Sequence, residues 1–387
     1  MKESRRRFLA GLAVPAAGMA ATGRRSNTTG LPLQLTAAGG PQLRYRTLGS
    51  TGLKITEMGF GCMVTSDPTV IEAAADMGIN FFDTARVYGG GNNERMVGGA
   101  LKSKRKDIIL CTKTKARTKA QAIADLDISL KELGTDYVDV LYIHSCNKVS
   151  DLNDDVLDAL PALKKQGKIR HGGFSTHDGQ VELLKAGAKM EQVEVILVAY
   201  NFTMDQDMTD AIAIAREAGK GIVGMKVMAG GFRRREPGDE LYDKFKQDGA
   251  MLAALKWVLK DKNVDTTIPS ITDMVQLEED LQSMATSYTN QDQELLARQL
   301  EYIRPLYCSI CGSCKGQCPK GLPVSDMIRY VSYAEGYGQF QMGRENYLRL
   351  PEKIQQVRCD DCDECLVQCP NGVKVAERVS RAQELFA

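Results

Sequence analysis

Eight cysteines near the C-terminus are the residues whose type and spacing point most clearly to chemistry. They form two copies of the run C-x2-C-x2-C-x3-C-P. This run typically holds cubane iron–sulfur clusters through its thiolates. Structural zinc usually uses paired C-x2-C knuckles, and disulfide frameworks are typical of short secreted domains. We therefore predict two 4Fe–4S clusters, with zinc and disulfides as the alternatives. The eight cysteines are Cys308, Cys311, Cys314, Cys318, Cys359, Cys362, Cys365 and Cys369.

The doubled run resembles that of bacterial two-cluster ferredoxins, in which the fourth cysteine of each run ligates the other cluster. Helical stretches expected at Asp326–Glu335 and Leu348–Gln356 separate the two runs, which favours an α-helical ferredoxin-like domain. The resemblance implies one cluster on Cys308, Cys311, Cys314 and Cys369, and the other on Cys359, Cys362, Cys365 and Cys318.

A second set of chemically capable residues follows the ends of three successive predicted strands. Asp83 ends the second strand and Tyr88 follows it closely, while Lys113 and His144 lie at the ends of the third and fourth strands. Polar side chains at the carboxyl ends of successive strands are typical of active sites in barrel enzymes. These four residues are therefore candidate catalytic residues.

The elements that would position them alternate short apolar runs with amphipathic stretches, such as Ala120–Leu133, Asp210–Ala218 and Gly249–Leu259. Eight strand–helix units within about 250 residues predict a (β/α)8 TIM barrel. A doubly wound sheet is the alternative, but it would want a glycine-rich phosphate turn that Gly59-Phe60-Gly61 does not match. The predicted strands are Ile55–Gly61, Asn80–Asp83, Asp107–Thr112, Val138–His144, Ile169–Ser175, Val193–Tyr200, Gly221–Met228 and Thr266–Pro269.

Four segments of this middle region resemble signatures of the aldo/keto reductase family. They are FFDTARVYGGGNNERMVGGAL, LGTDYVDVLYIHS, GKIRHGGFSTH and IPSITDMVQLEEDL, and the resemblance covers about Leu43–Asn290. It implies an oxidoreductase that interconverts a small carbonyl compound and an alcohol with a bound nicotinamide. The C-terminal region resembles the ferredoxin-like extension of one branch of that family.

The resemblance also implies a role for each candidate catalytic residue. Tyr88 is the general acid or base, and Lys113 favours its phenolate by lowering the phenol pKa. Asp83 fixes Lys113 in place. His144 donates a hydrogen bond that orients the substrate oxygen and helps to stabilise an alkoxide.

The residues implied for the cofactor depart from the family pattern at several positions. Thr176 stands where asparagine is common, and Met225 replaces a tyrosine that typically stacks on the nicotinamide. The last loop has no Lys or Arg for a 2′-phosphate and adds Asp273, so that NAD and NADP both stay open. The cofactor-binding set is Ser175, Thr176, Met225, Lys226, Ser270, Thr272, Gln276, Glu279 and Asp280.

The N-terminus has the pattern of an export signal. Ser4–Leu9 (SRRRFL) resembles the twin-arginine signal, and Phe8–Ala21 is apolar like the core of a signal peptide. A basic disordered tail is the alternative. The twin-arginine route carries folded proteins, which suits a chain whose clusters are assembled in the cytoplasm. We predict a periplasmic or otherwise exported protein that uses the twin-arginine export machinery.

The predicted organisation is a signal peptide at 1–21, a linker at 22–42, the barrel at 43–297 and the ferredoxin-like domain at 298–387. A net charge of +1, from 50 basic and 49 acidic residues, gives no reason to expect nucleic acid. No apolar run is long enough to span a membrane. Cys62, Cys111 and Cys146 are expected to be buried and unreactive.

The predicted function joins the two redox units. The barrel would exchange electrons through the clusters with a one-electron redox partner protein. We therefore expect the segment around Cys308–Cys318 to pack at the active rim, near the loops after barrel strands one, seven and eight. The alternatives are a non-catalytic redox sensor or scaffold, and an ordinary carbonyl reductase with structural clusters.

Overall fold

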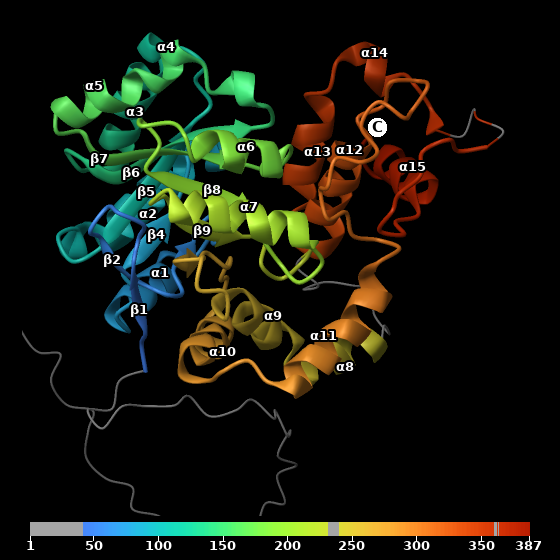
Figure 1. Ribbon diagram of the computed structural model, residues 1–387, viewed down its shortest axis with the longest axis horizontal. Helices are drawn as coiled ribbons and strands as arrows, with labels where there is room; N and C mark the ends of the chain where they lie inside the picture. Colours follow the sequence, from blue (N-terminus) through green and yellow to red (C-terminus); the bar gives the residue numbers. More distant parts are fainter. Residues whose placement is uncertain (1–41, 231–239, 360–361, 363) are drawn as a thin grey trace, which may run out of the picture. The chain divides into compact units, whose positions relative to one another are not determined.

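The computed structural model describes residues 42–230, 240–359, 362 and 364–387, all of which fall in the compact unit Leu31–Ala387 (Figure 1). The predicted signal peptide and the linker up to residue 41 lie outside the described residues. No helix in the described part of the chain is long and apolar enough to cross a membrane.

Eight parallel strands form a nearly closed barrel, which confirms the predicted barrel and excludes the doubly wound alternative. The strands pair in sequence order, and isolated bridges from Met58 to Thr267 and from Gly61 to Ser270 bring the two edges together. The strands are β3 (Phe60–Gly61), β4 (Phe81–Asp83), β5 (Ile109–Thr114), β6 (Val138–Cys146), β7 (Ile169–Thr176), β8 (Val195–Ala199), β9 (Gly221–Met225) and β10 (Thr266–Thr267).

The predicted first strand, Ile55–Gly61, divides into two parts in the structure. Its beginning belongs to an antiparallel hairpin of β1 (Tyr45–Thr47) and β2 (Lys54–Thr56), and only Phe60–Gly61 enters the barrel. The beginning of the segment leaves the barrel because β2 pairs with β1, with Tyr45 opposite Thr56 and Thr47 opposite Lys54. The hairpin turn reaches the beginning of β9, where Ser50 N donates a hydrogen bond of 2.8 Å to Gly219 O.

Strand residues alternate between two cores, as the pleat requires. Phe81, Val140 and Leu197 belong to an inner cluster of buried residues that also includes Leu48 and Ile55 from the hairpin. Their neighbours along the strands pack outward with the apolar faces of the helices in the largest cluster. The strand ends are thereby fixed, which makes their rim a rigid base for polar side chains.

Helices cover the outside of the barrel (Figure 1). Polar residues cap several of them, and Asp205 accepts a hydrogen bond from Met208 N, so α7 begins at Gln206 rather than at the predicted Asp210. The helices of this region are α1 (Pro68–Asp76), α2 (Asn92–Leu101), α3 (Lys119–Leu133), α4 (Asp154–Leu157), α5 (Ala159–Lys165), α6 (Gln180–Gly187), α7 (Gln206–Glu217), α8 (Glu240–Gln247), α9 (Ala250–Leu259), α10 (Met274–Ala285) and α11 (Asn290–Ile303).

The described C-terminal region is helical and has a hydrophobic core of its own. Met327, Val331, Tyr347 and Phe386 are among its buried residues. Its first helix continues into a π-helical turn at Ser332–Gly336. The helices are α12 (Val324–Val331), α13 (Phe340–Leu348), α14 (Glu352–Gln355) and α15 (Val375–Phe386).

The C-terminal region packs on the rim formed by the carboxyl ends of the barrel strands. Asn201, after β8, donates a hydrogen bond of 3.1 Å to the Tyr307 hydroxyl. A Cβ added at Gly336 would lie 1.9 Å from the carbonyl oxygen of Gly230, which shows how closely the two backbones approach. Lys315 lies 3.8 Å from Asp178, after β7. These contacts involve the loops after barrel strands five, six and seven, so of the three loops expected only that after strand seven takes part in them.

Candidate active site and cysteine quartets

Lys113 connects the residues that end the second and third barrel strands. Its Nζ donates hydrogen bonds to Asp83 Oδ2 at 2.5 Å, Thr84 O at 2.7 Å and the Tyr88 hydroxyl at 3.3 Å. The lysine side chain is 1% exposed and that of Asp83 3% exposed. The His144 ring meets the Tyr88 ring edge-on, with centroids 5.9 Å apart. The structure thus brings together the four residues that the sequence singled out.

Burial decides the protonation state of Tyr88. It raises the pKa of the phenol, and the opposing effect of Lys113 is smaller. Lys113 lowers the phenol pKa, which is the direction that the sequence predicts, but burial outweighs this effect and leaves the pKa above its usual value. Burial alone would lower the pKa of Lys113, but Asp83 and Tyr88 together raise it. At neutral pH Tyr88 carries its proton beside a charged lysine, which suits a proton donor.

His144 is a neutral imidazole at neutral pH. Burial lowers its pKa well below the usual range, and the positive charges of Lys113, Lys115 and Arg117 act in the same direction. Arg117 Nη2 donates to His144 O at 2.9 Å and so holds the end of the strand. The Nδ1 atom of His144 is buried and has no hydrogen-bond partner among the described residues. One ring nitrogen is thus available to a substrate oxygen.

The residues assigned to the cofactor follow β7, β9 and β10. Ser175 Oγ accepts a hydrogen bond of 3.0 Å from Ser145 N. Thr272 N donates to Gln276 Oε1 at 2.9 Å, which orders the start of α10 on which Glu279 and Asp280 also lie. Thr176, Met225, Lys226 and Ser270 lie at the carboxyl ends of the same strands or directly after them. Their roles in binding a nucleotide remain predictions.

Two residues beside these four were missed by sequence reasoning. Tyr333, in the π-helical turn of the C-terminal region, interacts electrostatically with Tyr88 and receives a hydrogen bond of 3.4 Å from Lys226. His177 interacts with His144 and has a buried, unpartnered Nδ1. The sequence signal for His177 was its place two residues after Ser175, whereas Tyr333 belongs to no motif.

The eight cysteines gather in two groups that each combine both runs. Cys308 interacts electrostatically with Cys314, Cys311 and Cys369. Cys359 interacts with Cys365, Cys318 and Cys362. Burial raises the pKa of Cys308 to about 12, and the neighbouring thiols add to the shift. These are the two ligand sets that the ferredoxin resemblance implies.

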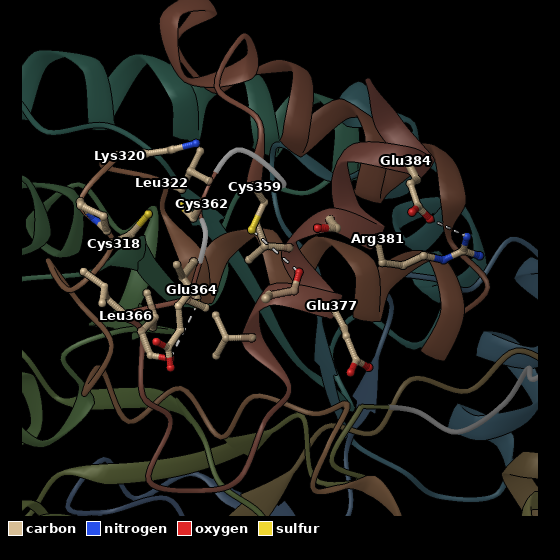
Figure 2. Close-up of a pocket in the computed structure, with 18 residues that line it drawn as sticks. Cys318, Lys320, Leu322, Cys359, Cys362, Glu364, Leu366, Glu377, Arg381 and Glu384 are labelled. Carbon is tan, nitrogen blue, oxygen red and sulfur yellow. Dashed lines mark hydrogen bonds and ion pairs between the residues drawn. The ribbon is translucent and has the colours of Figure 1, made fainter.

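A cavity of about 590 Å³ adjoins the second group (Figure 2). Cys318, Cys359, Cys362 and Cys365 line it, together with apolar side chains such as Leu322 and Val379. Within the described ranges, no three His, Cys, Asp or Glu side chains are spaced to hold a single metal ion. Charged side chains such as Lys320 and Glu364 also line the cavity, and its four thiol donors nevertheless fit a cluster held by four thiolates.

The remaining cysteines are buried, as expected. Cys62, Cys111 and Cys146 are 0% exposed. Burial raises the pKa of all three thiols, that of Cys146 to about 12. Thiols that stay protonated are poor nucleophiles, so these residues are part of the packing.

Comparisons with known proteins agree with this geometry. Residues 65–300 match the sequence model of the aldo/keto reductase family, more than half of the chain. The chain is similar to the uncharacterized oxidoreductase YqkF of Bacillus subtilis, with 30% identity over 54% of this chain and 72% of the relative. It is also similar to L-galactose dehydrogenase of Arabidopsis thaliana, with 26% identity over 68% and 96% of the two chains.

A solved structure shows the same fold. The holo form of the aldo-keto reductase AKR11C1 from Bacillus halodurans aligns with a TM-score of 0.57 and 27% identity. The alignment covers 66% of this chain and 96% of that one, so a third of this chain has no counterpart there. The chain belongs to the aldo/keto reductase family and is an oxidoreductase of that type.

Proposed function

We propose that this protein interconverts a small carbonyl compound and an alcohol with a nicotinamide cofactor. The observation that carries the proposal is the hydrogen bond from Lys113 to Tyr88, made while Lys113 also holds Asp83. In reduction, a hydride adds to the carbonyl carbon and Tyr88 Oη gives its proton to the oxygen. His144, neutral and with an unpartnered nitrogen, orients that oxygen.

The support for a nicotinamide nucleotide is the position of the predicted cofactor residues in the barrel, since the last loop offers no positive charge for a 2′-phosphate. They lie after β7, β9 and β10, the strands whose loops hold the nucleotide in the resemblance. Thr272 and Gln276 offer hydroxyl and amide groups where a 2′-phosphate would favour a cation. NAD and NADP are therefore both proposed, and the nucleotide extracted from protein purified without oxygen decides between them.

We also propose that the cysteine groups hold two 4Fe–4S clusters. The support is the pairing of Cys308 with Cys369 and of Cys359 with Cys318, which joins the two runs as in two-cluster ferredoxins. The clusters would supply one-electron transfer to a redox partner protein. Two clusters can together accept the two electrons of one hydride, so one catalytic turnover would reduce both clusters of the C-terminal region once.

The same reasoning makes export by the twin-arginine route part of the proposal. The nicotinamide pool is cytoplasmic, so an exported enzyme would keep its nucleotide bound and recycle it through the clusters. The non-catalytic sensor is not favoured, because the four candidate catalytic residues form one connected group. Lys113 is hydrogen-bonded to Asp83 and Tyr88, and the Tyr88 ring packs against that of His144.

The test is an assay of the anaerobically purified protein with NADH, NADPH and a panel of aldehydes, ketones and alcohols. The proposal requires turnover of at least one of these compounds with the nucleotide that is found bound. Bound nucleotide without consumption of any carbonyl or alcohol would instead support the redox sensor.

A further inference from the structure

The C-terminal region contributes a second tyrosine–lysine contact beside Tyr88. Lys226 Nζ lies 3.4 Å from the Tyr333 hydroxyl and 4.8 Å from the centre of its ring. Tyr333 is 8% exposed and interacts electrostatically with Tyr88. It lies in the π-helical turn Ser332–Gly336, a feature that often marks functional sites. The C-terminal region is therefore part of the surroundings of the candidate active site.

Positive charge is in excess around this contact. The positive charges of Lys226 and Arg329 both lower the pKa of Tyr333 and of His177. Lys115 and Arg117 lower the pKa of His144 in the same way. Arg329 and the exposed Arg349 lower that of Lys115.

The carboxylates facing the same groups already have partners. Asp83 is bound by Lys113, Asp326 pairs with Arg329 at 2.5 Å, and Asp178 pairs with Lys315 at 3.8 Å. Burial raises the pKa of Tyr333, but Lys226 and Arg329 outweigh it and lower the pKa overall. The described residues thus leave a net positive charge beside the candidate active site.

Two buried nitrogens in this group have no hydrogen-bond partner among the described residues. They are His177 Nδ1 and Arg329 Nε. The side chain of Arg329 is 15% exposed, so water reaches little of it. A buried polar group without a partner costs free energy, and a ligand that accepts its hydrogen bond recovers that cost. An unpartnered guanidinium nitrogen among cations points to an anionic acceptor.

Lys226 belongs to the predicted cofactor set, whereas Lys115 lies apart from the phosphate loop that the resemblance implies. The phosphate loop implied by the resemblance follows β10, the eighth barrel strand, and contains Ser270 and Thr272. Lys115 follows β5, the third strand, and acts on His144 after the fourth. Strands three and eight are not neighbours in the barrel. Lys115 therefore lies on the part of the rim that carries His144, where the substrate oxygen is expected.

We propose that the substrate carries an anionic group, a carboxylate or a phosphate, which Arg329 and Lys115 bind beside Tyr333. The C-terminal region thereby completes the substrate site as well as holding the cysteines. The inference rests on the proposed function in placing the substrate at Tyr88 and His144. Binding of the anionic group does not itself require turnover, so the two can fail separately.

The experiment is a calorimetric titration of the full cluster-loaded protein with unreactive probes. Succinate and glycerol 3-phosphate represent the two anions, and butane-1,4-diol and glycerol are their uncharged counterparts. Each titration is run with and without saturating NADH. We expect one of the anions to bind at least tenfold more tightly than its counterpart, whether or not NADH is present. Succinate and glycerol 3-phosphate also distinguish a carboxylate from a phosphate.

Three variants locate the anion. Arg329→Gln should weaken binding by about tenfold to a hundredfold, the effect of losing one charge-assisted hydrogen bond. Lys115→Gln, at an exposed residue, should weaken it in the same direction. Arg344→Gln removes the same charge from an exposed position on α13 and should leave the affinity unchanged.

Three outcomes would overturn the inference. The anions could bind no more tightly than the uncharged probes. Saturating NADH could displace the anion, which would place it in the nucleotide phosphate site. Arg344→Gln could weaken binding as much as Arg329→Gln, which would indicate general attraction to a positive surface. Turnover that survives Tyr88→Phe would defeat the proposed function and leave the anion site standing.

Discussion

At the scale of single residues, the candidate chemistry depends on how a buried lysine is shared. Lys113 neutralises Asp83 and still reaches the Tyr88 hydroxyl at 3.3 Å. Burial keeps the phenol pKa above its usual value, so the lysine moderates the shift rather than reversing it. The structure therefore favours Tyr88 as an acid in the direction of carbonyl reduction.

Tyr88→Phe should lower kcat by roughly 10²–10⁴-fold, because it removes the proton that the substrate oxygen receives. Nucleotide affinity should stay within about twofold of the parent value, since the ring remains and no charge is lost. Tyr45→Phe, on the exposed hairpin, is the matched control and should behave as the parent. A Tyr88→Phe enzyme that works at the parental rate would show that another group transfers the proton.

Lys113→Met should lower activity in the same way and also harm the fold. It removes the charge that pairs with Asp83, and a buried carboxylate without its partner typically costs about 3–5 kcal/mol. Because Asp83 would then take up a proton, the double variant Asp83→Asn/Lys113→Met should recover part of the stability but none of the activity. Urea unfolding and steady-state rates measure the two effects. Equal stability of the single and the double variant would contradict the pairing.

The cysteine groups predict separable losses of iron. Reconstituted protein should hold about eight iron atoms per chain, from two four-iron clusters. Cys314→Ser and Cys365→Ser should each lose about half of the iron, and the clusters that remain should differ in their spectra. Stoichiometric zinc without acid-labile sulfide would instead identify structural zinc sites.

At the scale of elements, the barrel positions the candidate catalytic side chains and the C-terminal region covers them. β4, β5 and β6 carry Asp83, Lys113 and His144 at one rim, where Asp83 lies opposite Cys111 and Lys113 opposite Tyr142, so each candidate is two residues farther along its strand than the partner of the one before. The π-helical turn reaches the same rim because Gly230 and Gly336 let two backbones meet. The absence of a side chain at Gly336 is therefore what allows the two regions to meet at this point.

Gly336→Ala should separate the C-terminal region from the rim. The new Cβ would meet the Gly230 carbonyl at 1.9 Å, and backbone cannot move as cheaply as a side chain. We expect a loss of about 1–3 kcal/mol in the free energy of unfolding, the usual cost of overpacking. Gly99→Ala, in α2 with open space around the added Cβ, is the control and should be neutral or slightly stabilising. Equal stability of both variants in urea would mean that the two regions are not in contact.

The sequence predicts the barrel well because strand ends and helix faces are local patterns. It assigns the hairpin residues Ile55 and Thr56 to a barrel strand, since pairing with Tyr45–Thr47 is decided by tertiary register. It brings Asp83, Lys113 and His144 together because the carboxyl ends of parallel strands share a rim. Tyr333 and its partner Lys226 are 107 residues apart and carry no motif, so only the fold reveals their contact. The direction of the Tyr88 pKa depends on burial, which the sequence does not give.

At the scale of the whole molecule, the barrel and the C-terminal region with its cysteine groups form one compact unit. Tyr307, directly before Cys308, receives a hydrogen bond from Asn201, which also donates to Lys226 O at 3.0 Å. The first cysteine group therefore begins one residue after Tyr307, which Asn201 connects to the backbone of Lys226 in the predicted cofactor set.

Export should depend on the first arginine pair. Replacing Arg5 and Arg6 by Lys should retain the protein in the cytoplasm, because the export receptor reads the arginines themselves. The same replacement at Arg24 and Arg25, in the predicted linker, conserves charge in the same way and should leave export unchanged. Fractionation of cells measures both. If the parent protein, the Arg5 and Arg6 variant and the Arg24 and Arg25 variant all distribute between the fractions in the same way, the result contradicts twin-arginine export.

The central claim, that the barrel and the clusters exchange electrons, is tested most directly by adding NADH, or NADPH where that is the nucleotide found bound, to the cluster-loaded protein without oxygen. Oxidation of one NADH releases two electrons, and each of two clusters accepts one. We predict that one equivalent of NADH is oxidised per chain while the cluster absorbance falls and the paramagnetic signal of reduced clusters appears. If the bound NADH stays reduced while dithionite reduces the same clusters, the two redox units do not communicate and the account is wrong.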